Sequence, residues 1–544
     1  TRKESSAASD VYKRQVVQTY LFFFIELHSI LQLQNQNATL PKENRQPSAI
    51  KMHRYRFYNT MKATTFALIL LSILTGTCLT SCIDDDFTTN PSHVLAFSTD
   101  TVAFDTVFTT IGTSTRSFRI YNRNKKSLNI SSIKLADAEH SGFHINVDGM
   151  SGDNFTNVEI RGKDSLYVFV EANIDPTNQD NPIFIVDSIV FVTNGVQQDV
   201  KLTAYGQDVI IKRGETFTTD THLTDERPYL IYDSLVVAPG TTLQIEPGAR
   251  LHFHHRASLL VQGKLQVEGS MEAPVQIRGD RLDRLFADLP YDNLGGQWGG
   301  IRFYPESFGN KISYAYVRGM TSGIVLDSCA SEEPRLEIAN SRIRNSSGNL
   351  ITSVYSRLNC WNSELSDAGG AILSLTGGIA DFTHCTIVNY YFYDIITSPI
   401  VNMSYCAPAD TISGGPALLR ARFNNSILYG NTSEIPSIDL TGSHVYFRSC
   451  LLRSNGEDDD NFINTVWNGQ PFFKATGEEH YYYDYRIGSD KSDAIGKGNP
   501  DFAIFPLDKD MYGNLRSTSV DIGAYQYIPP VSYTHLTLPT TPYV

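Results

Sequence analysis

The chain has 544 residues, which is enough for more than one folded domain. Its formal net charge of −13 argues against a nucleic-acid partner, because phosphates require a basic surface. Its 38 glycines stand among abundant Asn, Ser, Thr and aromatic residues, a mixture that suits short strands joined by turns. We therefore expect an all-β protein with little helix.

Both ends of the chain are predicted to lie outside the fold. Residues 6–15 (SAASDVYKRQ) and 531–544 (VSYTHLTLPTTPYV) resemble translated sequencing-adaptor read-through. On this interpretation residues 1–60 are a non-native or upstream extension and residues 528–544 an adaptor-derived tail. A genuine N-terminal extension is the alternative for the first of these. We place the natural start at Met61.

An export signal follows Met61. Residues 66–74 are apolar but too few to span a bilayer as a helix. The segment closes with Leu79, Thr80, Ser81 and Cys82. This run resembles the bacterial lipobox, which implies cleavage before Cys82 and a lipid on its sulfur. Residues 61–81 are thus a predicted lipoprotein signal peptide, and the membrane is a predicted partner through the acyl chains. A soluble secreted protein is the alternative.

An acidic run follows the predicted lipidation site. It consists of Asp84, Asp85 and Asp86, in a stretch from 82 to 92 that we interpret as a tether. The run resembles the surface-export signal of Bacteroidetes lipoproteins, which implies an outer-membrane protein that faces the extracellular side. A plain solvated tether at the periplasmic face of the outer membrane is the alternative.

Residues 93–208 are predicted to form a first domain. Short alternating runs, among them 101–108 and 116–121, are separated by polar turns, and Asn194-Gly195 favours a tight hairpin. This pattern indicates an antiparallel sandwich. The segments 118–122 (FRIYN) and 202–206 (LTAYG) resemble the immunoglobulin-like β-sandwich found near the N-terminus of many Bacteroidetes lipoproteins. That resemblance implies a spacer or docking module.

Residues 209–527 are repetitive, with apolar i,i+2 pairs set between glycine-containing corners. A four-residue motif recurs in the second half, and its second residue is always small and its fourth always aliphatic. Its copies begin at Tyr314, Asn340, Asn362, His384, Asn425 and Ser449. The starts are 26, 22, 22, 41 and 24 residues apart, which is one coil of a parallel β-helix per copy with an insertion within 390–416.

Two further segments carry a family resemblance. Residues 296–301 (GQWGGI), followed by Gly323-Ile324, resemble coils of right-handed parallel β-helix proteins of the pectate-lyase-like superfamily. Residues 492–525 resemble the terminal coil and cap of such surface proteins, with Asp493 where the family usually has Pro. The resemblance implies the fold and not the activity. Members that are enzymes are polysaccharide lyases or glycoside hydrolases.

In this superfamily, lyases neutralise a uronate carboxylate, often with Ca²⁺ held by Asp or Glu, and abstract a proton with Arg or Lys. Hydrolases use a pair of carboxylates. The candidates are Asp327, Asp367, Asp381, Arg342, Arg344, His384 and Arg448. Coil stacking is expected to bring Arg342, Glu364 and Thr386 into one exposed row, because they share the third motif position. No tight cluster of carboxylates falls at matched positions, which favours solvated outer faces.

The sequence predicts no cofactor. His252 and His254 share a strand face expected to lie in solvent, without a third metal ligand nearby. Residues 457–460 (EDDD) could hold Ca²⁺, but they lack the glycine spacing of a calcium loop, and a solvated loop is preferred. Cys385 and Cys450 share the small second motif position, and we expect them to be buried and stacked.

Aromatic residues supply the leading functional hypothesis. Trp298, Trp361, Tyr391 and Tyr393 are possible glycan contacts, since aromatic rings bury the C–H faces of sugars. Further candidates are Trp467, Tyr390 and the tyrosines between 481 and 485. We therefore predict a non-catalytic module that binds a polysaccharide or a surface protein through the β-helix. A lyase or hydrolase is the first alternative. A structural or adhesive surface component is the second.

Overall fold

The computed structural model describes residues 86–286, 288–329, 333–406, 418–477, 481–516 and 519–530. The predicted lipobox at Leu79 to Cys82, together with Asp84 and Asp85, lies outside these ranges. Within them the protein is all-β, as predicted, with only short 3₁₀ turns. No helix in the described ranges has the length and hydropathy of a membrane span.

The first domain consists of two sheets on one hydrophobic core that includes Phe118, Val168 and Phe191. One sheet contains β1 (Ala96–Phe97), β3 (Arg116–Tyr121), β9 (Ser165–Ala172), β5 (Phe143–Val147) and β6 (Met150–Gly152). The other contains β2 (Thr101–Phe108), β11 (Val196–Gln207), β10 (Ile183–Thr193), β4 (Leu128–Leu135), β7 (Asn154–Phe155) and β8 (Val158–Ile160). Asn194 and Gly195, both at positive φ, form the predicted tight turn between β10 and β11.

The acidic end of the predicted tether belongs to this domain. The backbone carbonyl of Asp86 accepts a hydrogen bond from Ser127 N (3.2 Å), and its carboxylate lies 3.0 Å from Lys126 Nζ. Thr88 N in turn donates to Ser127 O (3.0 Å). Residues 86–88 are therefore hydrogen-bonded to this domain, although they precede the predicted boundary at residue 93.

The second domain consists of three long parallel sheets. Sheet I contains β12 (Ile210–Arg213), β15 (Tyr229–Tyr232), β18 (Arg250–Phe253), β21 (Val275–Gly279), β26 (Ala315–Met320), β29 (Arg342–Ser346), β32 (Glu364–Ala368), β35 (Thr386–Asn389), β38 (Ile427–Gly430) and β40 (Leu451–Leu452). Sheet II contains β13 (Thr216–Phe217), β16 (Ser234–Val237), β19 (Ser258–Val261), β24 (Gly300–Phe303), β27 (Ile324–Leu326), β30 (Ile351–Val354), β33 (Leu373–Thr376) and β36 (Val401–Ser404). Sheet III contains β14 (Thr221–Leu223), β17 (Thr242–Ile245), β20 (Lys264–Glu268), β25 (Asn310–Ser313), β28 (Leu336–Ala339), β31 (Arg357–Trp361), β34 (Ile379–Thr383), β37 (Arg420–Asn424), β39 (His444–Arg448) and β41 (Phe462–Ile463).

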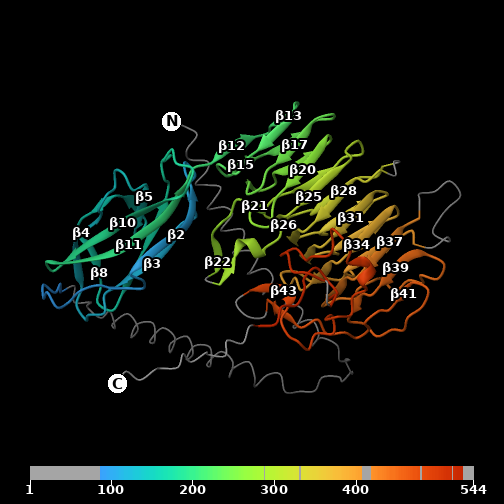
Figure 1. Cartoon of the computed structure of the whole chain (residues 1–544). Helices are drawn as coiled ribbons and strands as arrows, with labels where there is room; N and C mark the ends of the chain where they lie inside the picture. Colours follow the sequence, from blue (N-terminus) through green and yellow to red (C-terminus); the bar gives the residue numbers. More distant parts are fainter. Residues whose placement is uncertain are drawn as a thin grey trace, which may run out of the picture. The chain divides into compact units, whose positions relative to one another are not determined.

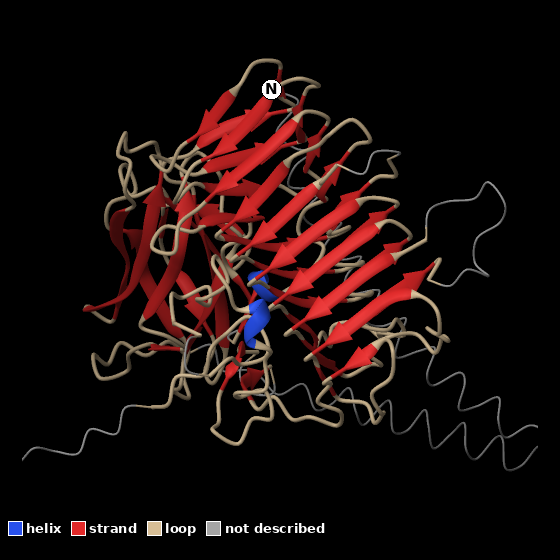
Figure 2. Cartoon of the chain, turned by 45° about the vertical axis from the view of Figure 1, so that its right-hand side comes forward, coloured by secondary structure: helices blue, strands red, loops and turns tan. Residues whose placement is uncertain are grey.

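The chain visits sheets I, II and III in turn, and each strand pairs with its counterpart about one coil later (Figures 1 and 2). This arrangement is compatible with a β-helix. One continuous core runs between the sheets. Within it Phe382, Phe423, Phe447 and Phe462 stack at centroid separations of 5.0, 4.8 and 4.8 Å, which is the spacing of neighbouring strands.

The recurring motif has a backbone cause. Its first residue always has a left-handed conformation, with φ between 45° and 54° in all six copies. Asn adopts that conformation more readily than most residues, which explains its frequency at this position. The turn directs the chain from sheet III into sheet I, so the motif marks the corner before β26, β29, β32, β35, β38 and β40.

The small second residue of the motif forms a ladder inside this corner. Ser341 Oγ accepts a hydrogen bond from Ala315 N (3.0 Å), and Ser363 Oγ accepts one from Ser341 N (3.1 Å). Each hydroxyl also donates to the carbonyl two residues before it, at 2.7 Å for Ser341 and 2.8 Å for Ser363. Cys385 and Cys450 occupy the same position and are fully buried, as predicted.

The sequence pattern missed one insertion. Between β21 and β24 the chain forms the hairpin of β22 (Arg284–Phe286) and β23 (Leu289–Pro290) and the 3₁₀ turn η2 (Tyr291–Asn293). The predicted insertion within 390–416 does contain irregular chain, but it also holds β36. After β36 sheet II ends, and the described part of the later coils continues only in sheets I and III.

Candidate functional site

The predicted row of Arg342, Glu364 and Thr386 exists on the outer side of sheet I. The three residues are register partners on β29, β32 and β35. The row is not exposed, however, since Glu364 is 3% and Thr386 0% accessible. The expectation of an exposed row is wrong because residues 492–527 fold back over sheet I, a tertiary contact that no local pattern signals.

Hydrogen bonds from this C-terminal segment pair the polar groups of the row. The Tyr525 hydroxyl binds the Glu364 carboxylate, and Arg342 Nε donates to the same hydroxyl (3.1 Å). Ala524 N donates to Thr386 Oγ1 (3.0 Å). Burial disfavours the charge on Arg342, but Tyr525 and Glu364 outweigh it and hold the pKa of Arg342 above its usual value. These groups are therefore paired inside the protein and do not face a substrate.

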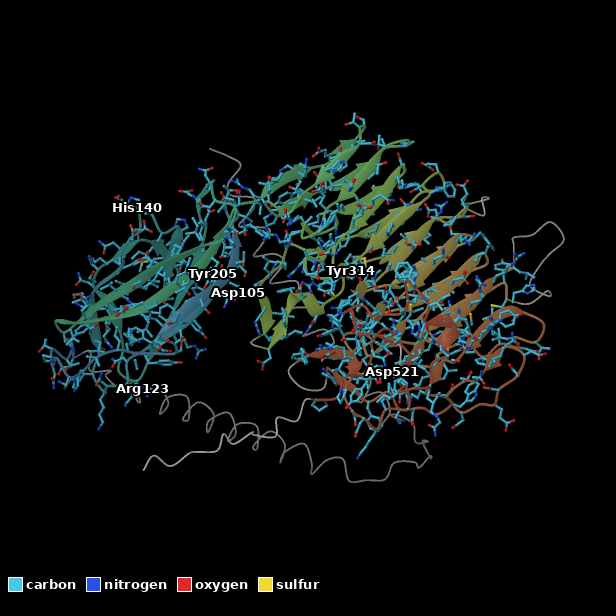
Figure 3. All side chains as sticks on the ribbon, viewed as in Figure 1. Asp105, Arg123, His140, Tyr205, Tyr314 and Asp521 are labelled. Carbon is cyan, nitrogen blue, oxygen red and sulfur yellow. The ribbon has the colours of Figure 1, made fainter. Side chains whose placement is uncertain are left out.

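The left-handed corner residues anchor the same segment. Asn362 Nδ2 donates to Lys509 O (2.9 Å), and Arg516 Nη2 donates to Asn362 Oδ1 (2.8 Å). Two coils further on, Asn425 exchanges two hydrogen bonds with the backbone of Asn499, at 2.7 and 2.9 Å. Figure 3 shows Asp521 among the closely packed side chains of this region.

A second buried charged group lies beside the first. Arg344 and Asp367 are 3.9 Å apart, and the Tyr485 hydroxyl donates to Asp367 Oδ1 (2.6 Å). Burial raises the pKa of Asp367, although Arg344 and Tyr485 lower it. His384 is also fully buried, and burial holds its pKa well below the usual value.

The remaining catalytic candidates lie on other sheets. Asp327 follows β27 of sheet II and pairs with Arg302 at 2.9 Å. Asp381 on β34 of sheet III pairs with Arg422 through both of its oxygens, one of them 2.7 Å from Arg422 Nη2. Arg448 lies on β39, also in sheet III. The structure thus does not bring the seven candidates together into one groove.

An open hollow of about 500 Å³ lies beyond the carboxyl ends of the sheet I strands. Three connections that leave sheet I contribute to it: the 281–297 insertion after β21, the segment after β35 and the segment after β38. The hairpin of β42 (Phe473–Thr476) and β43 (Tyr483–Ile487) completes the wall. The lining residues are Asp288, Tyr390, Phe392, Asn431, Thr476, Gly477 and Tyr481.

Aromatic rings dominate this hollow. Phe392 and Tyr481 stack with their ring centroids 5.6 Å apart and their planes at 13°. The Tyr390 ring stacks on the buried Tyr485 ring with their centroids 6.0 Å apart, and this contact holds the Tyr390 ring in place. Phe392 remains 49% exposed. An exposed large aromatic face in a hollow is costly to leave in water and is typical of a ligand contact.

The insertion and the hairpin hold the wall in place. Asn293 Nδ2 donates to Tyr481 O (2.7 Å), and Asn345 Nδ2 donates to Asp292 O (2.6 Å). Asp292 also forms ion pairs with Arg278 and, at 3.0 Å, with Arg318 on the outer side of sheet I. Arg278 has its pKa lowered to about 10 by burial, even though Asp292 favours its charge. Arg278 and Arg318 are therefore tied to the insertion through Asp292.

Sequence reasoning located part of this site. Tyr393 is half-buried beside it, in contact with Phe392 at 4.3 Å, and Tyr391 is 7% exposed behind Tyr393. Tyr390 and Tyr481 line the hollow and were among the aromatic candidates, whereas Phe392, Asp288 and Asn431 line it and were not predicted. The sequence shows that aromatic residues are concentrated around positions 390 and 481. It does not show which of their rings face outward.

The two predicted tryptophan contacts lie elsewhere. Trp298 is fully buried, stacks on Phe253 at 4.4 Å and donates from Nε1 to Arg318 O (2.8 Å). It is a core residue with no face for a sugar, so this prediction is wrong. Trp361 is a half-buried residue of β31 in sheet III and does not line the hollow.

The described residues hold no group of three or more His, Cys, Asp or Glu side chains arranged for a metal. His252 is buried beside Arg278 of the next coil, contrary to the expected solvent exposure. In the acidic loop at 457–460, Asp458 accepts hydrogen bonds from Asn464 N (2.6 Å) and Trp467 Nε1 (3.1 Å). Its oxygens thus organise the loop.

Comparison with known proteins adds little. No family model matches the chain, and no curated protein does. Among solved structures, the VesB protease of Vibrio cholerae is similar over 21% of this chain and 31% of its own, at 10% identity and a TM-score of 0.15. A family 123 glycoside hydrolase from Clostridium perfringens covers 21% of this chain and 25% of its own, at 8% identity and a TM-score of 0.15. The periplasmic chaperone SfaE covers 21% of this chain and 57% of its own, at 16% identity and a TM-score of 0.15. The chain spans less than a third of the first of these, and such scores carry no argument about function.

Proposed function

We propose that the protein is a lipid-anchored component of the bacterial cell envelope that binds a glycan, without cleaving it, in the hollow at the end of sheet I. The observation that carries this proposal is the stacked and exposed pair of Phe392 and Tyr481. Such a pair offers flat apolar surface to the C–H face of a sugar. Asn431 and Thr476 beside it supply donors and acceptors for hydroxyl groups.

A non-catalytic role is preferred over a lyase or hydrolase. Cleavage would require either two carboxylates that reach the substrate, as in a hydrolase, or a basic residue together with a group that neutralises a uronate, as in a lyase. The carboxylates on sheet I that lie beside an arginine are both buried: Glu364 beside Arg342 under the C-terminal segment, and Asp367 beside Arg344 under Tyr485 of the β42–β43 hairpin. The alternative, a lyase or hydrolase, is supported by the resemblance of the fold to the pectate-lyase-like superfamily.

The binding proposal is tested by affinity electrophoresis of the purified chain in gels that contain soluble polysaccharides. We expect at least one polysaccharide to retard the protein, and Phe392→Ala and Tyr481→Ala to remove most of the retardation. Phe472→Ala is the matched control, because Phe472 is 46% exposed but lies outside the lining. Equal loss in all three variants, or release of new unsaturated or reducing ends, would contradict a specific non-catalytic site.

The anchor is a separate part of the proposal. It rests on the lipobox resemblance of Leu79 to Cys82 and on the acidic run of Asp84, Asp85 and Asp86. We expect metabolic labelling with an alkyne fatty acid to mark the wild-type chain but not Cys82→Ala. Proteinase treatment of intact cells is expected to remove the wild-type chain and to spare a variant with all three aspartates changed to Ala. A labelled Cys82→Ala chain would refute the anchor, and equal protection of both chains would refute surface display.

The domain roles follow the same proposal. The N-terminal sandwich, interpreted as immunoglobulin-like, would act as a spacer between the lipid and the β-helix, interpreted as right-handed. These roles are supported by the order of the segments along the chain, in which the predicted anchor comes first, the sandwich second and the binding domain last. Its test is deletion of residues 93–208, which is expected to leave glycan binding by residues 209–527 within twofold of that of the full chain.

A further inference from the structure

Four buried polar atoms behind the aromatic wall of the hollow have no hydrogen-bond partner among the described residues. They are Arg344 Nε, Asp367 Oδ2 and the hydroxyl oxygens of Tyr393 and Tyr483. Leaving one buried donor or acceptor unmet lowers the ratio of folded to unfolded protein by roughly 5- to 150-fold. Four such losses together would cancel most of the stability of a typical domain. We therefore expect a small polar group from outside the chain to satisfy them.

Contacts between the side chains place the two charged groups and one phenol together. Arg344 Nη2 lies 3.9 Å from Asp367 Oδ2, which is too far for a hydrogen bond. The Tyr485 hydroxyl (2.6 Å) and Tyr390 N (3.2 Å) both donate to Asp367 Oδ1, so that oxygen is satisfied and Oδ2 is not. The guanidinium carbon of Arg344 is 5.6 Å from the centre of the Tyr483 ring, which brings this phenol to the same place.

Tyr393 completes the cluster. Burial raises the pKa of both Tyr393 and Tyr483, and the nearby charge of Asp367 raises it further. The two phenols also shift the pKa of each other, so their hydroxyls are neighbours. The pair does not meet the geometry of a hydrogen bond, and both oxygens are closed to solvent.

Only lining residues separate the phenols from the hollow. Gly477 lines it, and a side-chain carbon at this position would lie 2.3 Å from Cζ and 2.6 Å from the hydroxyl of Tyr483. Phe392 also lines the hollow, and its ring centroid is 4.3 Å from that of Tyr393. The two hydroxyls therefore lie directly behind the surface that is proposed to contact a sugar.

We propose that these four atoms bind a hydroxyl group at the base of the hollow, an inference that rests on the proposed glycan-binding function. A hydroxyl can donate to Asp367 Oδ2 and accept from Arg344 Nε or a phenol at the same time. A carboxylate only accepts and an ammonium group only donates, so either would leave part of the set unmet. The hydroxyl belongs to the sugar itself or to a water molecule that bridges to the sugar. A sugar hydroxyl reaches the closed atoms only if a phenol turns aside, whereas a buried water requires no such movement.

The test removes one hydroxyl at a time from the full chain, as Tyr483→Phe and Tyr393→Phe. Affinity electrophoresis with mannan, xyloglucan and polygalacturonate measures binding, and urea unfolding followed by circular dichroism measures stability. We expect each variant to weaken the retardation seen with the wild type about fivefold or more. Tyr482→Phe is the matched control, because Tyr482 is a 58% exposed neighbour of Tyr483, and both measurements should stay within twofold of wild type.

The sign of the stability change identifies the source of the hydroxyl. If water is bound, losing a phenol hydroxyl lowers the folding equilibrium constant of the chain without polysaccharide. If only the sugar supplies the hydroxyl, the same change removes an unmet buried group and raises that constant.

Unchanged retardation in both variants would overturn the inference, whatever the stability change, and would leave the glycan-binding function standing. Retardation by none of the three polysaccharides, or retardation that Phe392→Ala and Tyr481→Ala both leave intact, would refute the glycan-binding function and the inference with it.

Discussion

The hydroxyl ladder at the corner before sheet I offers a direct measure of what holds the coils in register. Ser363 Oγ accepts from Ser341 N (3.1 Å) and donates to Trp361 O (2.8 Å), and the side chain is 0% accessible. In Ser363→Ala the Ser341 N–H becomes a buried donor without its acceptor, while Trp361 O keeps a bond from Asn340 N (3.3 Å). One orphaned buried donor costs about 1–3 kcal/mol.

The assay is urea unfolding of the full chain, followed by tyrosine fluorescence. We expect Ser363→Ala to lower the free energy of unfolding by that amount, and Ser363→Cys to lower it less, since Cys385 and Cys450 already occupy this position in other coils. Ser374→Ala, a half-buried change on the neighbouring sheet II, is the control and should stay within about 0.5 kcal/mol of wild type. If Ser363→Ala matched that control, the ladder would contribute nothing to stability.

Three further predictions concern the buried polar groups. Because the folded-state pKa of His384 lies well below its ordinary 6.5, the unfolded chain binds the extra proton. The protein should therefore lose stability as pH falls below about 6.5. His384→Asn, which restores the usual corner residue, should reduce that slope by up to about 1.4 kcal/mol per pH unit in urea unfolding, and an unchanged slope would refute the assignment. Burial raises the pKa of the Cys360 thiol, which lies 3.7 Å from the Cys385 sulfur, and that of Cys450 to about 12. These thiols should resist iodoacetamide at pH 8 in the native chain and react in urea, as read by mass spectrometry; rapid native labelling would contradict their burial. Tyr525→Phe removes a hydroxyl shared by Arg342 and Glu364, so hydrogen exchange in residues 492–527 should accelerate about fivefold or more while the core of sheet III is unchanged; equal exchange in both variants would show that this contact does not hold the segment.

The sequence predicted the repetitive part of the fold well because each element of the motif has a local cause. A left-handed corner selects Asn, a crowded ladder selects Ser or Cys, and a core position selects an aliphatic residue. The strands 101–108 and 116–121 of the first domain were likewise visible in the alternation of buried and exposed residues. These patterns repeat within a few residues and do not depend on what packs against them.

The candidate site was harder to predict because it depends on contacts between distant segments. Trp298 has the same local signature as an exposed aromatic residue, yet it stacks on Phe253 of the preceding coil inside the core. Glu364 is exposed on its own coil and becomes buried only when Tyr525, 161 residues later, covers it. The sequence located the aromatic segments of the hollow, but only the folded chain shows that Phe392 and Tyr481 meet.

The strictly repeated coils also make the reach of the binding domain adjustable. The hollow is built by segments that leave the stack from β21 onward, together with the hairpin of β42 and β43. The coils before β21 contribute no lining residue. Evolution could therefore add or remove one of those coils and shift the hollow along the stack by about 4.8 Å each time, without changing a single contact to the ligand. Proteins built on this plan should differ among themselves in length upstream of the binding site more than in the site.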